Sequence, residues 1–295
     1  MFDQRIHEVN GQRLSTLHAG PENAPVMLML HGFPEFGEAW AAVATRLAES
    51  HHVVLPDQRG CGASSKPQGV ESYRPKHLAS DMIALIRAVS PDRPVVLCGH
   101  DWGASVAYAV AFREPALVSH LVVANGAHPM TFQRALLAKG AQRDASQYIE
   151  VLRDPAADER MREGGFRRTF RMLDKFSTCH WLDDATRERY RAVWREALPT
   201  MIDWYRATPL RVPASDAPHE AFDFTDEMRE RYRVRCPHLL IWGVEDTALL
   251  PASHEGLDEF CDDLTVHEID GASHWLLHER PERVAALVRD WLETR

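Results

Sequence analysis

The fold of this chain is decided by Gly99-His100-Asp101-Trp102-Gly103, which follows the apolar run at residues 95–98 and precedes a helical pattern from Ala104. The five residues have the form of a G-x-S-x-G nucleophile elbow with Asp101 in the place of serine. Glycines suit so tight a strand-to-helix turn, because neighbouring Cβ atoms would clash there. Such a turn lifts its central side chain above the carboxyl ends of the strands, where α/β sheets bind ligands. The alternative is that Asp101 only caps the following helix.

Two residues far along the chain favour a catalytic role for Asp101. Asp246 follows the predicted strand at residues 239–242, and His274 follows the predicted strand at residues 264–269. The order nucleophile, acid, histidine is the one expected for this kind of elbow. Because each residue lies in a loop at the carboxyl end of a strand, we expect all three at one edge of the sheet.

Backbone groups next to the elbow are candidates for an oxyanion hole. His31-Gly32-Phe33-Pro34 follows the apolar run at residues 26–30. The backbone N–H groups of Phe33 and Trp102 would then converge on the position of the nucleophile. An ordinary strand-to-loop turn is the alternative for this stretch.

Short apolar runs alternate with helical patterns in the first half of the chain and again at its end. This rhythm predicts βαβ units and a mostly parallel sheet flanked by helices. Residues 129–233 differ, because they contain no strand-like run and are rich in charged and aromatic residues. We therefore predict a discontinuous α/β core of residues 1–128 and 234–295, interrupted by a helical segment at 129–233.

The composition excludes several classes of protein. Among the 295 residues, 45% are hydrophobic and 26% charged, which is typical of a globular protein, and the net charge of −9 disfavours nucleic-acid binding. No apolar run is long enough to cross a membrane. Five scattered cysteines and an N-terminus without a signal-peptide pattern predict a cytoplasmic protein. The histidines do not gather at ligand spacing, so we expect no metal and no cofactor. Monomer and homodimer both remain open.

On these residues the chain resembles the α/β-hydrolase superfamily over essentially its whole length. His31-Gly32-Phe33-Pro34-Glu35, Asp57-Gln58-Arg59-Gly60-Cys61-Gly62 and Gly99-His100-Asp101-Trp102-Gly103-Ala104 are similar to the epoxide hydrolase and dehalogenase branch. The resemblance implies the α/β-hydrolase fold with an inserted helical cap domain, which matches residues 129–233.

In epoxide hydrolases of this fold, two cap tyrosines protonate the epoxide oxygen. The resemblance implies that Tyr205, in Asp203-Trp204-Tyr205-Arg206, is one of them and that Tyr148, in Ser146-Gln147-Tyr148-Ile149, is the other. The alternative is that both tyrosines serve only the packing or the surface of the cap.

A carboxylate nucleophile suits displacement at a saturated carbon, because aspartate is already ionised at neutral pH. Asp101 would form an alkyl ester with the substrate. His274 would then activate water to hydrolyse the ester, and Asp246 would orient His274. Together these roles predict an epoxide hydrolase that converts a small apolar epoxide and water to a vicinal diol.

Two other functions remain as alternatives. A haloalkane or haloacetate dehalogenase would use the same nucleophile and N–H donors for the halide, and His180-Trp181 resembles the fluoride-binding pair of fluoroacetate dehalogenases. However, those enzymes carry arginines where this chain has Trp102 and Ser105. A non-catalytic receptor for a small ligand is the second alternative. For the substrate pocket, the expected residues are Trp102, Phe33, His180, Trp181 and Trp275.

Overall fold

The computed structural model describes residues 1–295 and contains one eight-stranded sheet with the order β1-β2-β4-β3-β5-β6-β7-β8. The strands β1 and β2 are antiparallel to each other, β2 is antiparallel to β4, and every other pair is parallel. The predicted mostly parallel sheet is confirmed. The strands are β1 (Asp3–Val9), β2 (Gln12–Ala19), β3 (Val26–Leu30), β4 (His52–Pro56), β5 (Val95–His100), β6 (Val118–Ala124), β7 (His238–Gly243) and β8 (Leu264–Ile269).

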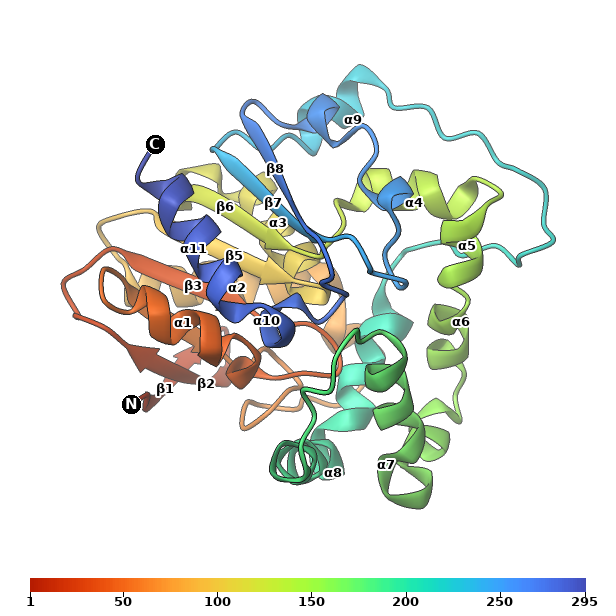
Figure 1. Cartoon of the computed structure of the whole chain (residues 1–295), viewed down its shortest axis with the longest axis horizontal. Helices are drawn as coiled ribbons and strands as arrows, with labels where there is room; N and C mark the ends of the chain where they lie inside the picture. Colours follow the sequence, from red (N-terminus) through yellow and green to blue (C-terminus); the bar gives the residue numbers. More distant parts are fainter.

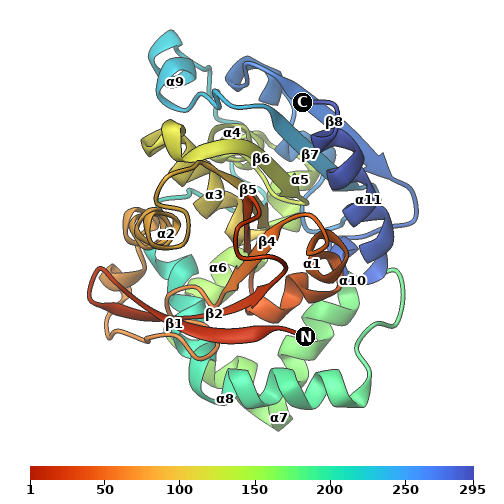
Figure 2. The same cartoon turned by 90° about the vertical axis from the view of Figure 1, so that its left-hand side faces the viewer.

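Helices cover both faces of this sheet (Figures 1 and 2). Successive side chains of a strand point to opposite faces. Accordingly, Leu28 of β3 belongs to one apolar cluster with α2 and α3, whereas Met27 and Met29 belong to a second cluster with α1 and α11. The covering helices are α1 (Ala41–Leu47), α2 (Pro75–Val89), α3 (Trp102–Arg113), α10 (Leu276–Glu279) and α11 (Pro281–Leu292). Short 3₁₀ helices lie at Gly37–Trp40, Val70–Tyr73, Pro115–Leu117, Pro251–Ser253 and Leu257–Phe260.

The remaining helices lie between β6 and β7 in the sequence, as the predicted insertion requires. In Figure 1 most of them form a layer beside the loops at one edge of the sheet. They are α4 (Pro129–Leu137), α5 (Ala141–Ala145), α6 (Tyr148–Arg153), α7 (Ala157–Lys175), α8 (Asp184–Ala207) and α9 (Asp226–Arg231), called the inserted helices below. The division into domains at residues 128 and 233 stays a prediction.

Hydrogen bonds from α8 attach the inserted helices to the loops after β3 and β4. The indole N–H of Trp194 donates to the carbonyl of Pro34 at 2.7 Å. The hydroxyl of Thr200 donates to the carbonyl of Gly60 at 2.6 Å, and the indole N–H of Trp204 donates to that of Arg59 at 3.1 Å. These loops leave the carboxyl ends of their strands, so the helices are held directly over the edge where ligands bind in α/β sheets.

The hairpin of β1 and β2 was missing from the expected strands. Its turn consists of Asn10 and Gly11, which both have positive φ, at 51° and 70°. Asn-Gly is the usual pair for a two-residue hairpin turn of this kind, so a local signal for the hairpin was present. No helix of the chain is both long enough and apolar enough to cross a membrane.

Candidate active site

Asp101 lies in the turn between β5 and α3 with φ 51° and ψ −120°, a conformation that non-glycine residues rarely adopt. Its neighbours explain how so tight a turn fits. A Cβ on Gly99 would lie 2.6 Å from the Cα of Ala104, and one on Gly103 would lie 2.2 Å from the carbonyl oxygen of Leu30. Both positions therefore require glycine. The side chain of Asp101 makes no capping hydrogen bond to α3, which argues against a purely capping role.

The carboxylate of Asp101 lies against the loop after β3. The backbone N–H of Phe33 donates to Oδ1 of Asp101 at 2.7 Å. A Cβ on Gly32 would lie 2.4 Å from the Cβ of Asp101, so only glycine allows this approach. The N–H of Trp102 makes no hydrogen bond to the carboxylate. An oxyanion hole made by the N–H groups of Phe33 and Trp102 stays a prediction. Only the N–H of Phe33 contacts the Asp101 carboxylate.

His274 lies between two carboxylates, as the chain order predicted. Its Nδ1 forms a hydrogen bond with Oδ2 of Asp246 at 2.8 Å. Its Nε2 lies 3.6 Å from Oδ2 of Asp101, which is an ion-pair distance but too long for a hydrogen bond. Burial by itself disfavours the charged imidazole. The negative charges of Asp246 and Asp101 outweigh that effect and raise the pKa of His274 to about 10.

Asp246 is held by a set of donors that the sequence did not reveal. Asn125 Nδ2 donates to Oδ2 at 2.6 Å, and the N–H groups of Ala248 and Leu249 donate to Oδ1 at 2.7 and 2.9 Å. Burial would raise the pKa of Asp246, but the charge on His274 and these donors together lower it. Glu245, the acidic residue next to Asp246 in this loop, is exposed. The residue that the sequence analysis missed is Asn125, which follows β6.

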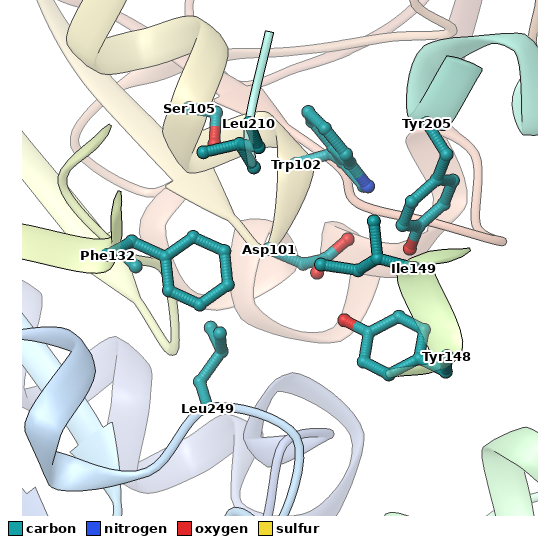
Figure 3. A pocket seen from close by; sticks show the side chains of 10 residues that line it. Asp101, Trp102, Ser105, Phe132, Tyr148, Ile149, Tyr205, Leu210 and Leu249 are labelled. Carbon is teal, nitrogen blue, oxygen red and sulfur yellow. The ribbon is translucent and has the colours of Figure 1, made fainter. Parts of the chain in front are cut away.

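Two tyrosines from the inserted helices face Asp101. Tyr148 begins α6 and Tyr205 lies near the end of α8, and in Figure 3 both hydroxyl groups point toward the Asp101 carboxylate. The Tyr205 ring packs edge-on against Phe33 and Trp102, with ring centroids 4.9 and 5.0 Å apart. Burial raises the pKa of both tyrosines far above the usual value, and the charge of Asp101 adds to this. Both hydroxyls therefore keep their protons at neutral pH.

Two cavities meet at Asp101, Tyr148 and Tyr205. The space not filled by atoms is about 370 Å³ in one and about 240 Å³ in the other, including space that is open to solvent. The remaining walls are largely apolar. The larger cavity is completed by Trp102, Ser105, Ala127, Phe132, Ile149, Leu210 and Leu249, and the smaller one by Phe33, Met172, Phe176, Ala248, His274 and Trp275.

The predicted pocket residues divide into two groups. Trp102, Phe33 and Trp275 line these cavities, but His180 and Trp181 do not. His180 is exposed. The indole of Trp181 stacks on His278 with ring centroids 3.9 Å apart, and its N–H donates to Ser177 Oγ at 3.0 Å. The structure therefore does not place His180 and Trp181 in the walls of these two cavities, since Trp181 packs on His278 of α10 instead.

A buried carboxylate beside the elbow had also been missed. Oε1 of Glu35 accepts hydrogen bonds from the Tyr190 hydroxyl at 2.9 Å and from Nε2 of His278 at 2.6 Å. Oε2 lies 3.3 Å from Nδ1 of His100 in the elbow. Burial acts to raise the pKa of Glu35, but the charge on His278 and the bonds from both histidines lower it overall. Glu35 thus links α8, α10 and the elbow. It was quoted above as the last residue of the motif that begins at His31, but no role was predicted for it.

The residues 1–295 contain no group of three or more histidine, cysteine or acidic side chains placed to bind a metal ion. The polar side chains at this site form a charged half and a neutral half. Asp101, Asp246 and His274 form the charged half, whereas the hydroxyls of Tyr148 and Tyr205 form the neutral half. A carboxylate, an imidazole and two tyrosine hydroxyls thus converge on one cavity junction, and groups of these types can supply a nucleophile, a base and proton donors.

Comparison with known proteins gives similarity over the whole chain. The family model for the alpha/beta hydrolase fold matches residues 25–281. The AB hydrolase superfamily protein YfhM of Bacillus subtilis is 30% identical over 290 residues, which cover 97% of this chain and 96% of that protein. Epoxide hydrolase 3 of Xenopus tropicalis is 29% identical over 288 residues, which cover 96% of this chain and 76% of that protein.

Solved structures show the same likeness. A structure described as a novel epoxide hydrolase from metagenomes of hot environments superposes with a TM-score of 0.89 at 33% identity, covering 99% of both chains. The epoxide hydrolase of Bacillus megaterium in complex with an inhibitor superposes with a TM-score of 0.87 at 28% identity, covering 98% of this chain and 100% of that one.

Proposed function

Because the chain belongs to the α/β-hydrolase superfamily, in its epoxide hydrolase branch, we propose that it hydrolyses an epoxide to a vicinal diol through an ester on Asp101. One observation carries the proposal: the Asp101 carboxylate faces two protonated tyrosine hydroxyls across a largely apolar cavity. An epoxide needs this pairing, because its oxygen leaves the attacked carbon as a strongly basic alkoxide unless it is protonated.

The first step joins the two halves of the site. Oδ2 of Asp101 attacks a ring carbon, the carbon–oxygen bond of the ring breaks, and a hydroxyl of Tyr148 or Tyr205 gives its proton to the epoxide oxygen. The product is a hydroxyalkyl ester of Asp101 and one tyrosinate. The apolar walls of the cavity strengthen these charge interactions by excluding water.

The second step uses His274. Esterification removes the negative charge of Asp101, which is one of the two charges that raise the pKa of His274. The imidazole can then lose its proton, which restores the tyrosine hydroxyl, and accept one from water. The activated water attacks the ester carbonyl, and the N–H of Phe33 stabilises the negative charge that develops on Oδ1. Collapse of this intermediate breaks the bond between the carbonyl carbon and the alkoxy oxygen. The proton on His274 passes to that oxygen, which releases the diol and leaves Asp101 as a carboxylic acid. Asp101 then gives the remaining proton, which came from the water, to His274, so that the carboxylate and the charged imidazole are both restored.

Dehalogenation is supported less well. Expelling a halide needs no proton, only N–H donors around the leaving anion. Trp102 brings one indole donor to the larger cavity, but His180 and Trp181 lie outside both cavities. A receptor without activity is also supported less well. Burying a charged His274 between two carboxylates costs desolvation free energy, and binding a ligand does not require this arrangement.

The test is to stop the cycle between its two steps. In His274→Gln the attack of Asp101 is retained and the hydrolysis is lost, so the ester should accumulate when the protein is incubated with a styrene-oxide-type epoxide. Mass spectrometry should find a gain equal to the mass of the epoxide on the peptide that contains Asp101. The matched control Asp101→Ala should show no gain on this peptide. An unmodified Asp101 in His274→Gln, together with diol formation by the unaltered protein, would contradict the ester mechanism.

A further inference from the structure

The larger cavity contains one hydroxyl that the proposed reaction does not use. Ser105 lies on α3 one turn after Asp101 and lines this cavity, and Figure 3 shows its oxygen turned from the helix toward the enclosed space. Its neighbours away from Asp101 carry only hydrocarbon side chains: Ala127, Phe132, Ile149, Leu210 and Leu249. Ser105 is therefore an isolated polar group in an apolar wall.

The hydroxyl of Ser105 has no hydrogen-bond partner in the protein. Serine and threonine within helices usually donate to the carbonyl four residues earlier. Ser80 in α2 does so to Lys76 at 2.7 Å, and Thr45 in α1 does so to Ala41 at 2.8 Å. Ser105 makes no such bond to Asp101, whose carbonyl accepts the N–H of Ala104 at 3.1 Å instead. The donor of Ser105 is thus available to a molecule in the cavity.

The position of Ser105 defines which atom of a substrate it can reach. Asp101 is the residue directly before α3, and Ser105 lies in the first turn of this helix, so both side chains line the same cavity along α3. A substituent that runs from the attacked epoxide along α3 therefore passes Ser105 shortly after the ring. An acceptor atom one methylene beyond the ring lies at the right depth for a hydrogen bond, whereas a methylene there leaves the hydroxyl unpaired, which costs free energy in an apolar wall.

The other cavity offers no equivalent donor for a substituent. Apart from the reacting groups Asp101, Tyr148, Tyr205 and His274, its walls consist of Phe33, Met172, Phe176, Ala248 and Trp275. A substituent with an acceptor is consequently better placed in the larger cavity, and its apolar end then contacts Phe132, Leu210 and Leu249.

We propose that Ser105 is a specificity-determining residue that favours glycidyl ethers, epoxides with an ether oxygen one methylene from the ring, by donating a hydrogen bond to that oxygen. The inference rests on the proposed epoxide hydrolysis and names its substrate class. Ser105 takes no part in bond breaking, so its effect appears as a preference between substrates.

A pair of substrates isolates this hydrogen bond. Phenyl glycidyl ether and 4-phenyl-1,2-epoxybutane have the same length and differ in an oxygen replaced by a methylene. The measured quantity is the ratio of their kcat/KM values in the unaltered protein and in Ser105→Ala. Differences in intrinsic reactivity cancel when the two ratios are compared, as in a double-mutant cycle. We expect the preference for the ether to fall by about 3- to 10-fold in Ser105→Ala, the worth of one hydrogen bond.

Two further variants complete the test. Ser105→Thr keeps the hydroxyl and should keep most of the preference, and Ser80→Ala, which removes a helix hydroxyl outside the cavity, should leave the ratio unchanged. If both epoxides are hydrolysed and Ser105→Ala has the same ratio as the unaltered protein, the role of Ser105 is wrong while the proposed function stands. If the folded, unaltered protein hydrolyses neither epoxide, the proposed function is overturned and the role of Ser105 with it.

Discussion

The two halves of the site are held in place by different forces. At the sheet edge, Asp101, Asp246 and His274 are fixed by hydrogen bonds and by one another's charges. The bonds from Phe33 and Ala248 and the bond between Asp246 and His274 are 2.7–2.8 Å long. In the inserted helices, Tyr148 and Tyr205 are fixed by aromatic packing, and neither hydroxyl is tied to a backbone group. The loops at the sheet edge therefore fix the positions of the charged side chains, whereas packing of the inserted helices fixes the positions of the two tyrosine hydroxyls.

The difference has a physical basis. A buried charge needs several donors or an opposite charge, and these are available where strands end and loops expose N–H groups. A buried tyrosine mostly needs apolar surface for its ring, with the hydroxyl left for a ligand. The inserted helices contact the sheet edge through hydrogen bonds, such as those of Trp194 and Thr200 to loop carbonyls, and through an apolar cluster that they share with the core. We therefore expect changes in the two halves to have separable effects.

The largest effect is expected from the proton donors. The double variant Tyr148→Phe/Tyr205→Phe removes both hydroxyls and keeps the rings, so the alkoxide must leave without a proton. The rate of epoxide opening should fall by roughly 10²- to 10⁴-fold, the usual worth of general acid catalysis. The measurement is kcat/KM for an epoxide together with the melting temperature.

The matched control is Tyr232→Phe, which removes a hydroxyl from a half-buried tyrosine that lies against Phe112 and away from both cavities. It should leave the rate of epoxide opening unchanged. A double variant with an unchanged rate would show that the neutral half of the site is packing only. The ester on Asp101 would then form without an acid from these residues.

A smaller effect is expected where the two halves are joined. Tyr190→Phe removes the bond from α8 to the buried Glu35 and leaves the carboxylate with His278 as its remaining close donor. A hydrogen bond to a charged group contributes about 1.5–3 kcal/mol, so the free energy of unfolding should fall by about that amount. Chemical denaturation measures this, with Tyr232→Phe again as the control. A loss as small as that of the control would mean that Glu35 does not hold α8 to the core.

The last prediction concerns the charged half, whose contribution to stability changes only a little with pH near neutrality. The carboxylates raise the pKa of His274 from about 6.5 to about 10, so the folded protein holds a proton that the unfolded chain releases above pH 6.5. This stabilisation is fully present below pH 6.5 and is lost as the pH rises through 10. The melting temperature of the unaltered protein should therefore exceed that of His274→Gln by a margin that shrinks between pH 6.5 and 10. A margin independent of pH would show that His274 is neutral in the folded state.

Residues with a strong local signal were predicted most accurately. The elbow glycines around Asp101 are required by backbone contacts within a few residues, and Asp246 and His274 each follow a buried strand. The place of each residue directly after a strand was therefore enough to predict that it lies at the edge of the sheet. Tyr148 and Tyr205 had no such signal, because 57 residues separate them and only their family resemblance linked them to Asp101.

The errors have the opposite origin. His180 and Trp181 were expected at the pocket from a motif alone, but the stacking of Trp181 on His278 depends on a helix almost a hundred residues further along the chain. Asn125 and Glu35 gained their roles from Asp246, Tyr190 and His278, all of them distant in sequence. No pattern within a single segment contains such a pairing.

The sequence by itself predicted that the functional loops meet at one edge of a mostly parallel sheet, that Asp101 lies in an elbow-like turn and that a helical insertion is present, because apolar periodicity and glycine-rich turns act over short stretches of chain. Only the tertiary structure decided where the insertion lies, which of its aromatic residues face Asp101, and that Ser105 stands alone in an apolar wall. Those properties depend on how one helix packs against another and against the sheet. Packing between distant segments is the sum of many small contacts, and no local sequence motif predicts them.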